Sequence, residues 1–186
     1  MSLYILSAPS GTGKTTVVTK LTKKHPEEIA RVVTCTTRKP RGREMNGKDY
    51  HFLSKQEFVQ KINDGEFLEH QEIYGQHYGT LRSEVDKGIN TGKVVFLIID
   101  VQGAQELKRK IDAKTIFLMP PTFHELERRI RSRKEDHEMA IEERLAKARE
   151  EIAQGQQYDY VVTNDNLDET LKIIWDIVNK KHKQEN

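Results

Sequence analysis

The stretch that decides the fold is Ser7-Ala8-Pro9-Ser10-Gly11-Thr12-Gly13-Lys14-Thr15-Thr16. It follows the short apolar run Leu3 to Leu6, which is typical of a buried strand, and it opens the pattern Lys14 to Lys24, which predicts a helix. A glycine-rich turn of this kind, ending in Gly-Lys-Thr, is the setting of a phosphate-binding loop. Backbone N–H groups at Gly11 and Gly13 would turn toward an anion, and the helix N-terminus would add its positive dipole end.

We expect this loop to bind ATP through nine consecutive residues: Ala8, Pro9, Ser10, Gly11, Thr12, Gly13, Lys14, Thr15 and Thr16. Lys14 would bridge the β- and γ-phosphates, and the Thr15 hydroxyl would bind Mg²⁺. One departure from the usual pattern is Ala8, where the first position of the motif is normally glycine. The alternative interpretation is a strand-to-helix turn that binds no ligand.

Beyond the loop, strand-like and helix-like segments alternate along the chain. The predicted strands are Leu3 to Leu6, Arg31 to Thr34, Val94 to Ile99, Thr115 to Met119 and Tyr160 to Thr163. The predicted helices are Lys14 to Lys24, Gln102 to Lys110, Phe123 to Arg133, Ile141 to Gln154 and Leu167 to Lys181. This alternation favours an α/β fold of the P-loop NTPase type, a parallel sheet flanked by helices with ligands at the carboxyl ends of its strands.

Two regions interrupt the alternation. Residues 34–80 hold short strand candidates, Tyr50 to Leu53 and Phe67 to Ile73, and the turn signal Asn46-Gly47, so we expect an inserted small mixed-sheet lobe. Arg128 to Glu138 is dense in opposite charges, which suits a short helical lid. We therefore expect a single domain with a core at 1–33, 81–126 and 142–186, an acceptor lobe at 34–80 and a lid at 127–141.

Composition narrows the function classes. The chain has 186 residues, which suits one hydrophobic core, and a net charge of +2, which indicates neither nucleic acid nor an anionic membrane as a partner. A single cysteine, Cys35, cannot form an internal disulfide, and Met1 to Leu6 reads as a strand and not as a signal peptide. We expect a cytoplasmic protein. Its oligomeric state is not determined by the sequence.

Several motifs of the acceptor lobe resemble those of guanylate kinase, a P-loop nucleoside monophosphate kinase family, and they occur in the same order. They are Thr36-Thr37-Arg38-Lys39-Pro40-Arg41, Gly47-Lys48-Asp49-Tyr50-His51-Phe52, Gly65-Glu66-Phe67-Leu68-Glu69 and Tyr78-Gly79-Thr80. The resemblance runs from the phosphate loop to about Asn164. It implies that the phosphate of GMP is held by Arg38, Arg41, Tyr50 and Tyr78, and Arg forks and Tyr hydroxyls suit phosphate oxygens. Taken singly, each of these residues is equally compatible with a surface charge or a core amphipath.

Glu69 is the candidate base reader. Guanine displays two adjacent donors, N1–H and the exocyclic amine, which a carboxylate accepts side by side, whereas adenine presents an acceptor at N1. The resemblance places Thr34 and Thr80 beside the base as well. Ile98 stands where the family commonly has an acid, which leaves looser base selection open. The alternative for Glu69 is a solvated strand carboxylate.

Asp100 ends the apolar run that begins at Val94, a position where P-loop enzymes keep an acid near Mg²⁺, although Asp is also a common helix N-cap. The resemblance implies that Arg129, Arg133 and Arg144 contact the phosphates. With Lys14 and Arg38 they form the expected catalytic set. Asn164 resembles a residue that borders the adenine of ATP. The simpler interpretation for a run of arginines beside acids is a solvated helix face.

The leading hypothesis is an enzyme of purine nucleotide metabolism that transfers a phosphoryl group from ATP to GMP or dGMP with Mg²⁺. One alternative is a P-loop kinase with a different small phosphorylated acceptor, which Ile98 keeps open. Another is a guanylate-kinase-like module that binds proteins without catalysis. The intact Gly13-Lys14-Thr15 argues against that module, because a scaffold has no need to hold a triphosphate.

Overall fold

The computed structural model describes residues 2–132 and 138–185. Its central sheet has five strands, β1 (Leu3–Ser7), β2 (Ile29–Arg31), β7 (Val94–Ile98), β8 (Lys114–Met119) and β9 (Tyr160–Thr163). They lie in the order β2-β7-β1-β8-β9, and all neighbours are parallel. All five side chains of β1 are buried, as expected for a central strand covered on both faces.

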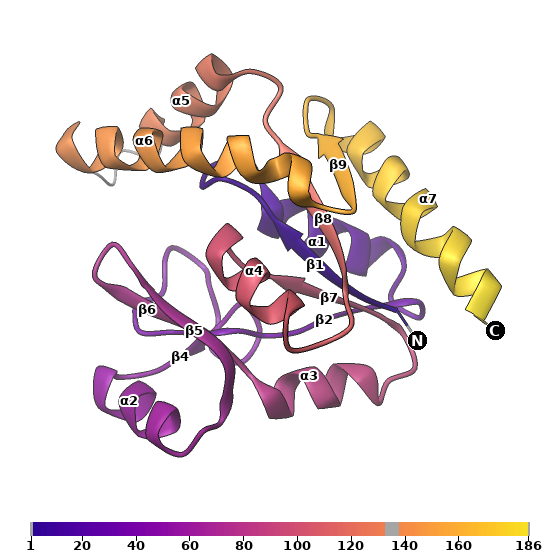
Figure 1. The fold of residues 1–186 in the computed structure, drawn as a ribbon, viewed down its shortest axis with the longest axis horizontal. Coiled ribbons are helices and arrows are strands. Elements are labelled where there is room, and N and C mark those ends of the chain that lie inside the picture. Colours follow the sequence, from indigo (N-terminus) through magenta and orange to yellow (C-terminus); the bar gives the residue numbers. More distant parts are fainter. Residues whose placement is uncertain (1, 133–137, 186) are drawn as a thin grey trace.

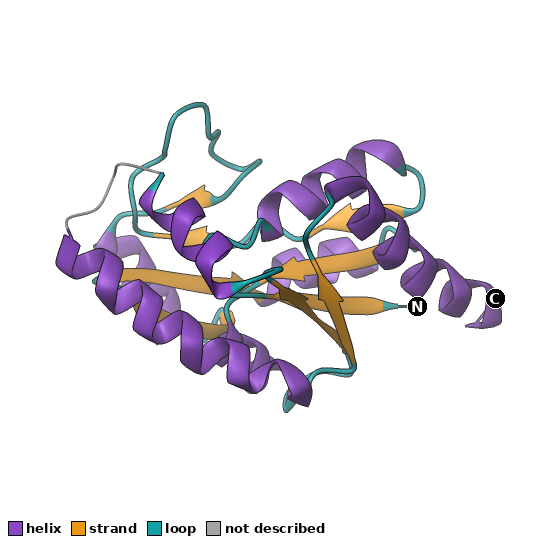
Figure 2. Ribbon diagram, turned by 90° about the horizontal axis from the view of Figure 1, so that it is seen from above, coloured by secondary structure: helices purple, strands orange, loops and turns teal. Residues whose placement is uncertain are grey.

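Helices cover both faces of this sheet (Figure 2). Because side chains alternate along a strand, Tyr4 and Leu6 pack on one face with α1 (Lys14–Lys24) and α7 (Leu167–Glu185). Leu3 and Ile5 pack on the other face with α3 (Arg82–Ile89) and α4 (Val101–Lys108). This arrangement fixes the loop between β1 and α1 at the carboxyl edge of the sheet.

A second, four-stranded mixed sheet lies beside the first, at the lower left of Figure 1. Its strands are β3 (Cys35–Thr36), β4 (His51–Phe52), β5 (Phe67–Ile73) and β6 (Gln76–Leu81), in the order β4-β3-β6-β5. Helix α2 (Lys55–Asn63) begins at a capping box made by Ser54 and Glu57. It packs Phe58 on Phe67, with the ring centroids 4.5 Å apart.

Two further helices, α5 (Phe123–Arg131) and α6 (Glu138–Gln154), pack together through their own apolar cluster, and the short helix η1 (Gly155–Gln157) follows. Helix α5 also packs against the phosphate loop. A Cβ atom at Gly11 would lie 3.1 Å from Cγ1 of Ile130 and 3.2 Å from Cδ1 of Leu126. A glycine is therefore needed at this position for close approach as well as for its backbone conformation.

The predicted fold class is confirmed: a parallel sheet flanked by helices carries a second mixed sheet. One predicted strand was displaced. Arg31 to Thr34 was expected, but β2 is Ile29–Arg31, because the chain turns after Val32 toward the second sheet, where Cys35 pairs with Gly79. Among the described residues, no helix combines the length and the apolar character needed to cross a membrane.

Candidate active site

The loop between β1 and α1 has the geometry of an anion-binding turn. Gly11 and Gly13 have φ angles of 91° and 101°, in the left-handed region that glycine adopts without strain. Gly13 is the N-cap of α1; no side chain caps the helix, and its first turn holds no acid. The N–H groups and the positive end of the dipole are thus left to an incoming anion.

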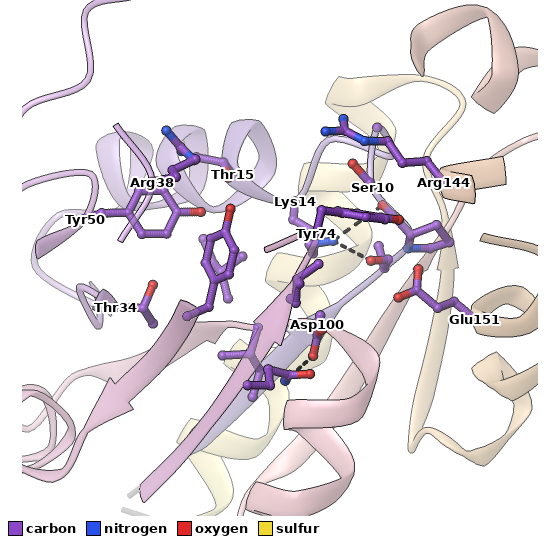
Figure 3. Close-up of a pocket in the computed structure, with 18 of the residues that line it drawn as sticks. Ser10, Lys14, Thr15, Thr34, Arg38, Tyr50, Tyr74, Asp100, Arg144 and Glu151 are labelled. Carbon is purple, nitrogen blue, oxygen red and sulfur yellow. Dashed lines mark hydrogen bonds between the residues drawn. The ribbon is translucent and has the colours of Figure 1, made fainter. Parts of the chain in front are cut away.

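The side chain of Lys14 folds back over this loop. Its ammonium group donates hydrogen bonds to the backbone oxygens of Ala8 and Pro9, drawn as dashed lines in Figure 3. The loop is also supported from behind by Asn164, whose amide donates to the Thr12 oxygen at 2.7 Å and accepts from Thr170. Asn164, expected to border adenine, is buried here and supports the loop backbone.

One cleft joins this loop to the second sheet. Its volume is about 510 Å³. Most of the expected nucleotide contacts line it: Ala8, Pro9, Ser10, Gly11, Gly13, Lys14, Thr15, Thr16, Thr34, Arg38, Arg41, Tyr50, Glu69, Tyr78, Asp100 and Arg144. Figure 3 shows Thr34, Arg38 and Tyr50 on one side and Ser10, Lys14 and Arg144 on the other. Residues from two separate sheets thus face a single space.

Arg38 is held in place at the acceptor end of the cleft. Two of its nitrogens bind the two oxygens of Glu44 at 2.7 and 2.8 Å, and its guanidinium lies 5.0 Å from the ring centroid of Tyr50. The hydrogen bonds from Arg38 hold the pKa of the Glu44 carboxyl below its ordinary value. Tyr50 in turn packs edge-on against Tyr78. The guanidinium and the two phenols therefore form one preorganised group of donors.

Glu69 lies deeper, with 2% of its surface exposed, and its Oε1 accepts a hydrogen bond of 2.6 Å from the Thr80 hydroxyl. Burial, assisted by the nearby charge of Asp100 and opposed by the hydrogen bond from Thr80, raises the pKa of Glu69 to about 7. Thr80, expected beside the base, thus contacts Glu69 and does not itself line the cleft. A buried carboxyl group with a raised pKa is suited to a ligand that brings two hydrogen-bond donors, because the donors stabilise its ionised form.

Of the two roles considered for Asp100, the structure shows the helix cap. Its Oδ1 accepts the backbone N–H of Gly103 at 2.8 Å, so it caps α4. Its Oδ2 is buried with no hydrogen-bond partner among the described residues, and the Lys147 ammonium lies 3.7 Å away. A carboxylate oxygen that accepts no hydrogen bond from the described part of the chain, in the cleft that Thr15 also lines, fits Mg²⁺, a hard cation that takes few protein oxygens and completes its shell with phosphate and water.

Further residues that line the cleft were not anticipated from the sequence, among them Gln71, Tyr74, Lys147 and Glu151. Burial raises the pKa of Glu151 to about 7, although the charges of Lys14 and Lys147 oppose this. The spacing of three of these residues from predicted site residues could have indicated that they line the cleft. Gln71 is two residues beyond Glu69 on the same strand face, and Lys147 and Glu151 are three and seven residues beyond Arg144 on the same helix face.

Of the three arginines expected to contact the phosphates, one lines the cleft, one does not, and one lies outside the described residues. Arg144 lines the cleft, with its guanidinium 5.1 Å from the ring centroid of Tyr74. Arg129 is absent from the cleft lining, and its Nε binds Glu125 of its own helix at 2.8 Å. Arg133 lies outside the described residues. Ile98, at the end of β7, also lines the cleft and adds apolar surface to it.

Comparison with known proteins gives a consistent result. The family model described as guanylate kinase matches residues 1–181. Guanylate kinase from Thiobacillus denitrificans is 44% identical over 171 residues, covering 91% of this chain and 81% of that protein. Guanylate kinase from Myxococcus xanthus is 44% identical over 178 residues, covering 95% and 85%.

Solved structures agree with this result. The crystal structure of guanylate kinase from Anaplasma phagocytophilum matches with a TM-score of 0.79 at 33% identity, covering 97% of this chain and 86% of that one. A crystal structure of shikimate kinase from Bacteroides thetaiotaomicron matches with a TM-score of 0.50 at 14% identity, a likeness of fold alone.

Proposed function

Because this chain belongs to the guanylate kinase family, we propose that its cleft transfers the γ-phosphoryl group of ATP to the phosphate of GMP, giving ADP and GDP. The enzyme is thus an ATP:GMP phosphotransferase, a nucleoside monophosphate kinase. The observation that carries the residue assignments is the shared cleft, in which an anion-binding loop faces a cluster of guanidinium and phenol groups. Two anionic nucleotides meeting head to tail would fill this arrangement.

On the donor side, the loop amides and Lys14 hold the β- and γ-phosphates of ATP. Lys14 exchanges its contacts with the Ala8 and Pro9 oxygens for phosphate oxygens. The Thr15 hydroxyl and Asp100, directly or through water, are the residues that would hold Mg²⁺. When bound, that ion neutralises charge on the phosphates.

On the acceptor side, Arg38, Arg41, Tyr50 and Tyr78 hold the phosphate of GMP. Glu44 binds both terminal nitrogens of Arg38 and orders this side chain at the cleft before the nucleotide arrives, which reduces the entropy lost on binding; the phosphate must share or replace these contacts. Glu69 accepts the N1–H and amine donors of guanine, with Thr34 and Thr80 beside it. Bound dGMP makes the same base and phosphate contacts.

Phosphoryl transfer needs positive charge around the moving group and exclusion of water, so the remaining arginines complete the site. Arg144 already lines the cleft. Arg129 must exchange its contact with Glu125 for one with the phosphates, and Arg133 must approach the phosphates together with Arg129. We assign residues 34–80 as the acceptor lobe and 127–141 as the lid that closes over the nucleotides. Purine nucleotide metabolism in the cytoplasm is the setting that this activity and the free, buried Cys35 favour.

The test is a coupled assay of ADP release with GMP, dGMP, AMP, CMP and UMP as acceptors. We expect GMP to be the preferred acceptor and Lys14→Ala to lower kcat by about 10³-fold, because a charged group at the transferred phosphate is lost. Lys20→Ala, an exposed change on the same helix, is the matched control and should match the parent.

Each rival function predicts a distinct outcome. Binding of GMP without turnover would indicate a non-catalytic module. Turnover with a preference for another acceptor would indicate a kinase of different specificity, the case that Ile98 would explain.

A further inference from the structure

Gln71 lies between two of the acids that line the cleft, Glu69 and Asp100. It is two residues beyond Glu69 on β5, and because side chains alternate along a strand, both lie on the face that lines the cleft. The first turn of α4 packs against this strand and brings Asp100 close. Three polar side chains from two elements therefore meet beside Gly103.

The contacts of the Gln71 amide define its orientation. Its Nε2 donates to Oδ1 of Asp100 at 2.5 Å, and the same side chain hydrogen-bonds the Glu69 carboxylate. A Cβ atom added at Gly103 would lie 2.5 Å from Gln71 Nε2 and 2.8 Å from Glu69 Oε2, which shows how closely the three groups converge. The nitrogen, and not the oxygen, faces the two acids, which suits their ionised forms because an ionised carboxylate only accepts hydrogen bonds.

This arrangement is unfavourable for the amide oxygen. Oε1 of Gln71 is buried and has no hydrogen-bond partner in the described part of the chain. A buried carbonyl left unpaired opposes folding, whereas hydrogen bonds to charged acceptors are among the strongest in proteins. The side chain is thus retained in this position by its nitrogen, which separates two carboxylates that would otherwise repel each other.

We propose that Gln71 is a positioning residue for base recognition, whose amide nitrogen fixes the Glu69 carboxylate toward the acceptor base and ties it to Asp100. The inference rests on the proposed function, in which Glu69 reads guanine and Asp100 lies beside the donor phosphates. Without the shared donor, the two carboxylates move apart, and Glu69 no longer presents both oxygens to the base. Loss of Gln71 should therefore affect the acceptor and leave the isolated binding of ATP intact.

The decisive variant is Gln71→Met, which keeps the length of the side chain and removes both polar atoms. We expect the KM for GMP to rise by about tenfold, the loss of one hydrogen bond to a charged group, and the preference for GMP over AMP to fall by a similar factor. The Kd for ATP measured by calorimetry without GMP should change less than about twofold. Gln71→Glu keeps an oxygen and removes the donor, so its KM for GMP should rise further.

A second variant tests the same contact from the helix side. Gly103→Ala leaves Gln71 in place but introduces a methyl group where the amide and Glu69 meet, so it should also raise the KM for GMP. Gly88→Ala is the matched control on α3, because its methyl group would contact the apolar Cγ1 of Val95 at 3.0 Å. We expect Gly88→Ala to keep the parent KM.

The outcomes separate this inference from the proposed function. If Gln71→Met lowers the melting temperature but leaves the KM for GMP and the GMP:AMP preference unchanged, the residue is merely structural and the inference is overturned. If Gln71→Glu matches the parent, the amide oxygen matters and not the donor, which also overturns it. Failure of the parent enzyme to phosphorylate GMP would refute the proposed function instead, and equal GMP affinities of parent and Gln71→Met by calorimetry would then overturn this inference as well.

Discussion

Glu69 is a buried carboxyl group whose neighbours act on its proton in opposite directions. Desolvation raises its pKa to about 7, and Thr80 and Gln71 donate hydrogen bonds that favour the ionised form. In the proposed function, guanine adds two more donors to the same oxygens. Binding of GMP would therefore favour the carboxylate and release a proton wherever the free enzyme holds one.

The sign of the resulting pH dependence follows from this linkage. Below pH 7 the free enzyme keeps Glu69 protonated, and the proton must leave before both guanine donors are accepted. We expect the KM for GMP to rise by about tenfold between pH 8 and pH 6, as for a single group of pKa near 7.

Glu69→Gln serves as the comparison for this prediction, because it cannot titrate. Its KM should be higher than that of the parent at pH 8 and should change little with pH beyond the titration of the GMP phosphate, which both enzymes share. Parallel pH profiles for the two enzymes would contradict the assignment of Glu69 as the group that titrates.

At the scale of single residues, the sequence predicted the groups that belong to short motifs and missed those that depend on neighbouring elements. Arg38, Tyr50 and Glu69 lie in motifs and line the cleft. Gln71 and Glu151 carry no motif, and their environment exists only after β5, α4 and α6 have packed together. For the same reason the sequence could not show that Asn164 turns toward the loop backbone at Thr12.

Among the helices and strands, those with a clear apolar pattern were predicted and those without one were missed. The bounds of α1, β5 and β9 agree with their predicted ranges, because each has a clear apolar period or run. Helix α2 was not predicted: among its side chains only Phe58 is buried, which leaves too little period to detect. Strand β3 has two residues and is defined only by its pairing with β4 and β6.

The hairpin of β5 and β6 brings the second sheet into contact with α6. Its turn contains Tyr74 and Gly75, with φ angles of 51° and 70°. A tyrosine in this region is strained by about 1 kcal/mol, and such strain persists where surrounding contacts determine the conformation. Here the ring lies 5.1 Å from the Arg144 guanidinium and 5.7 Å from the Lys147 ammonium. The hairpin thus positions two cations of α6 at the cleft.

We predict that Tyr74→Asn lowers kcat by about threefold to tenfold, because asparagine accepts the turn but removes the ring that holds Arg144. Its melting temperature should equal or exceed that of the parent, since the strain is reduced. Tyr74→Phe keeps the ring and should retain the parent kcat. A loss in Tyr74→Phe as large as that in Tyr74→Asn would assign the effect to the hydroxyl group and contradict this role.

At the scale of the whole molecule, the residues proposed for catalysis come from three parts of the fold: the central sheet, the second sheet, and the pair of helices α5 and α6 (Figure 1). Arg129 is bound to Glu125 in this conformation. Transfer requires reacting atoms about 3 to 3.5 Å apart and a site closed to water, so we expect these three parts to approach each other when both nucleotides are bound.

This motion can be measured as a distance between α2 and α5. Spin labels at Val59→Cys and Arg128→Cys lie on exposed positions outside the cleft, and the native Cys35 is buried with a pKa raised to about 12, so it does not compete for the label. We expect the mean distance to shorten by more than about 2 Å when GMP and a non-hydrolysable ATP analogue are added together. Either nucleotide alone should give a smaller change, because each bridges fewer of the three parts.

A second pair of labels separates closure from general compaction. Lys20→Cys on α1 and Ile173→Cys on α7 lie on helices that pack on the same face of the central sheet, so their distance should not change with nucleotides. A constant α2 to α5 distance at saturating concentrations of both nucleotides would mean that the lid does not close. Arg129 would then remain with Glu125 during transfer, and Arg144 would have to supply the lid charge together with Lys14 and Arg38. In that case Arg129→Ala should retain the parent kcat while Arg144→Ala loses it, a result that would assign the lid's share of the catalytic charge to α6 and not to α5.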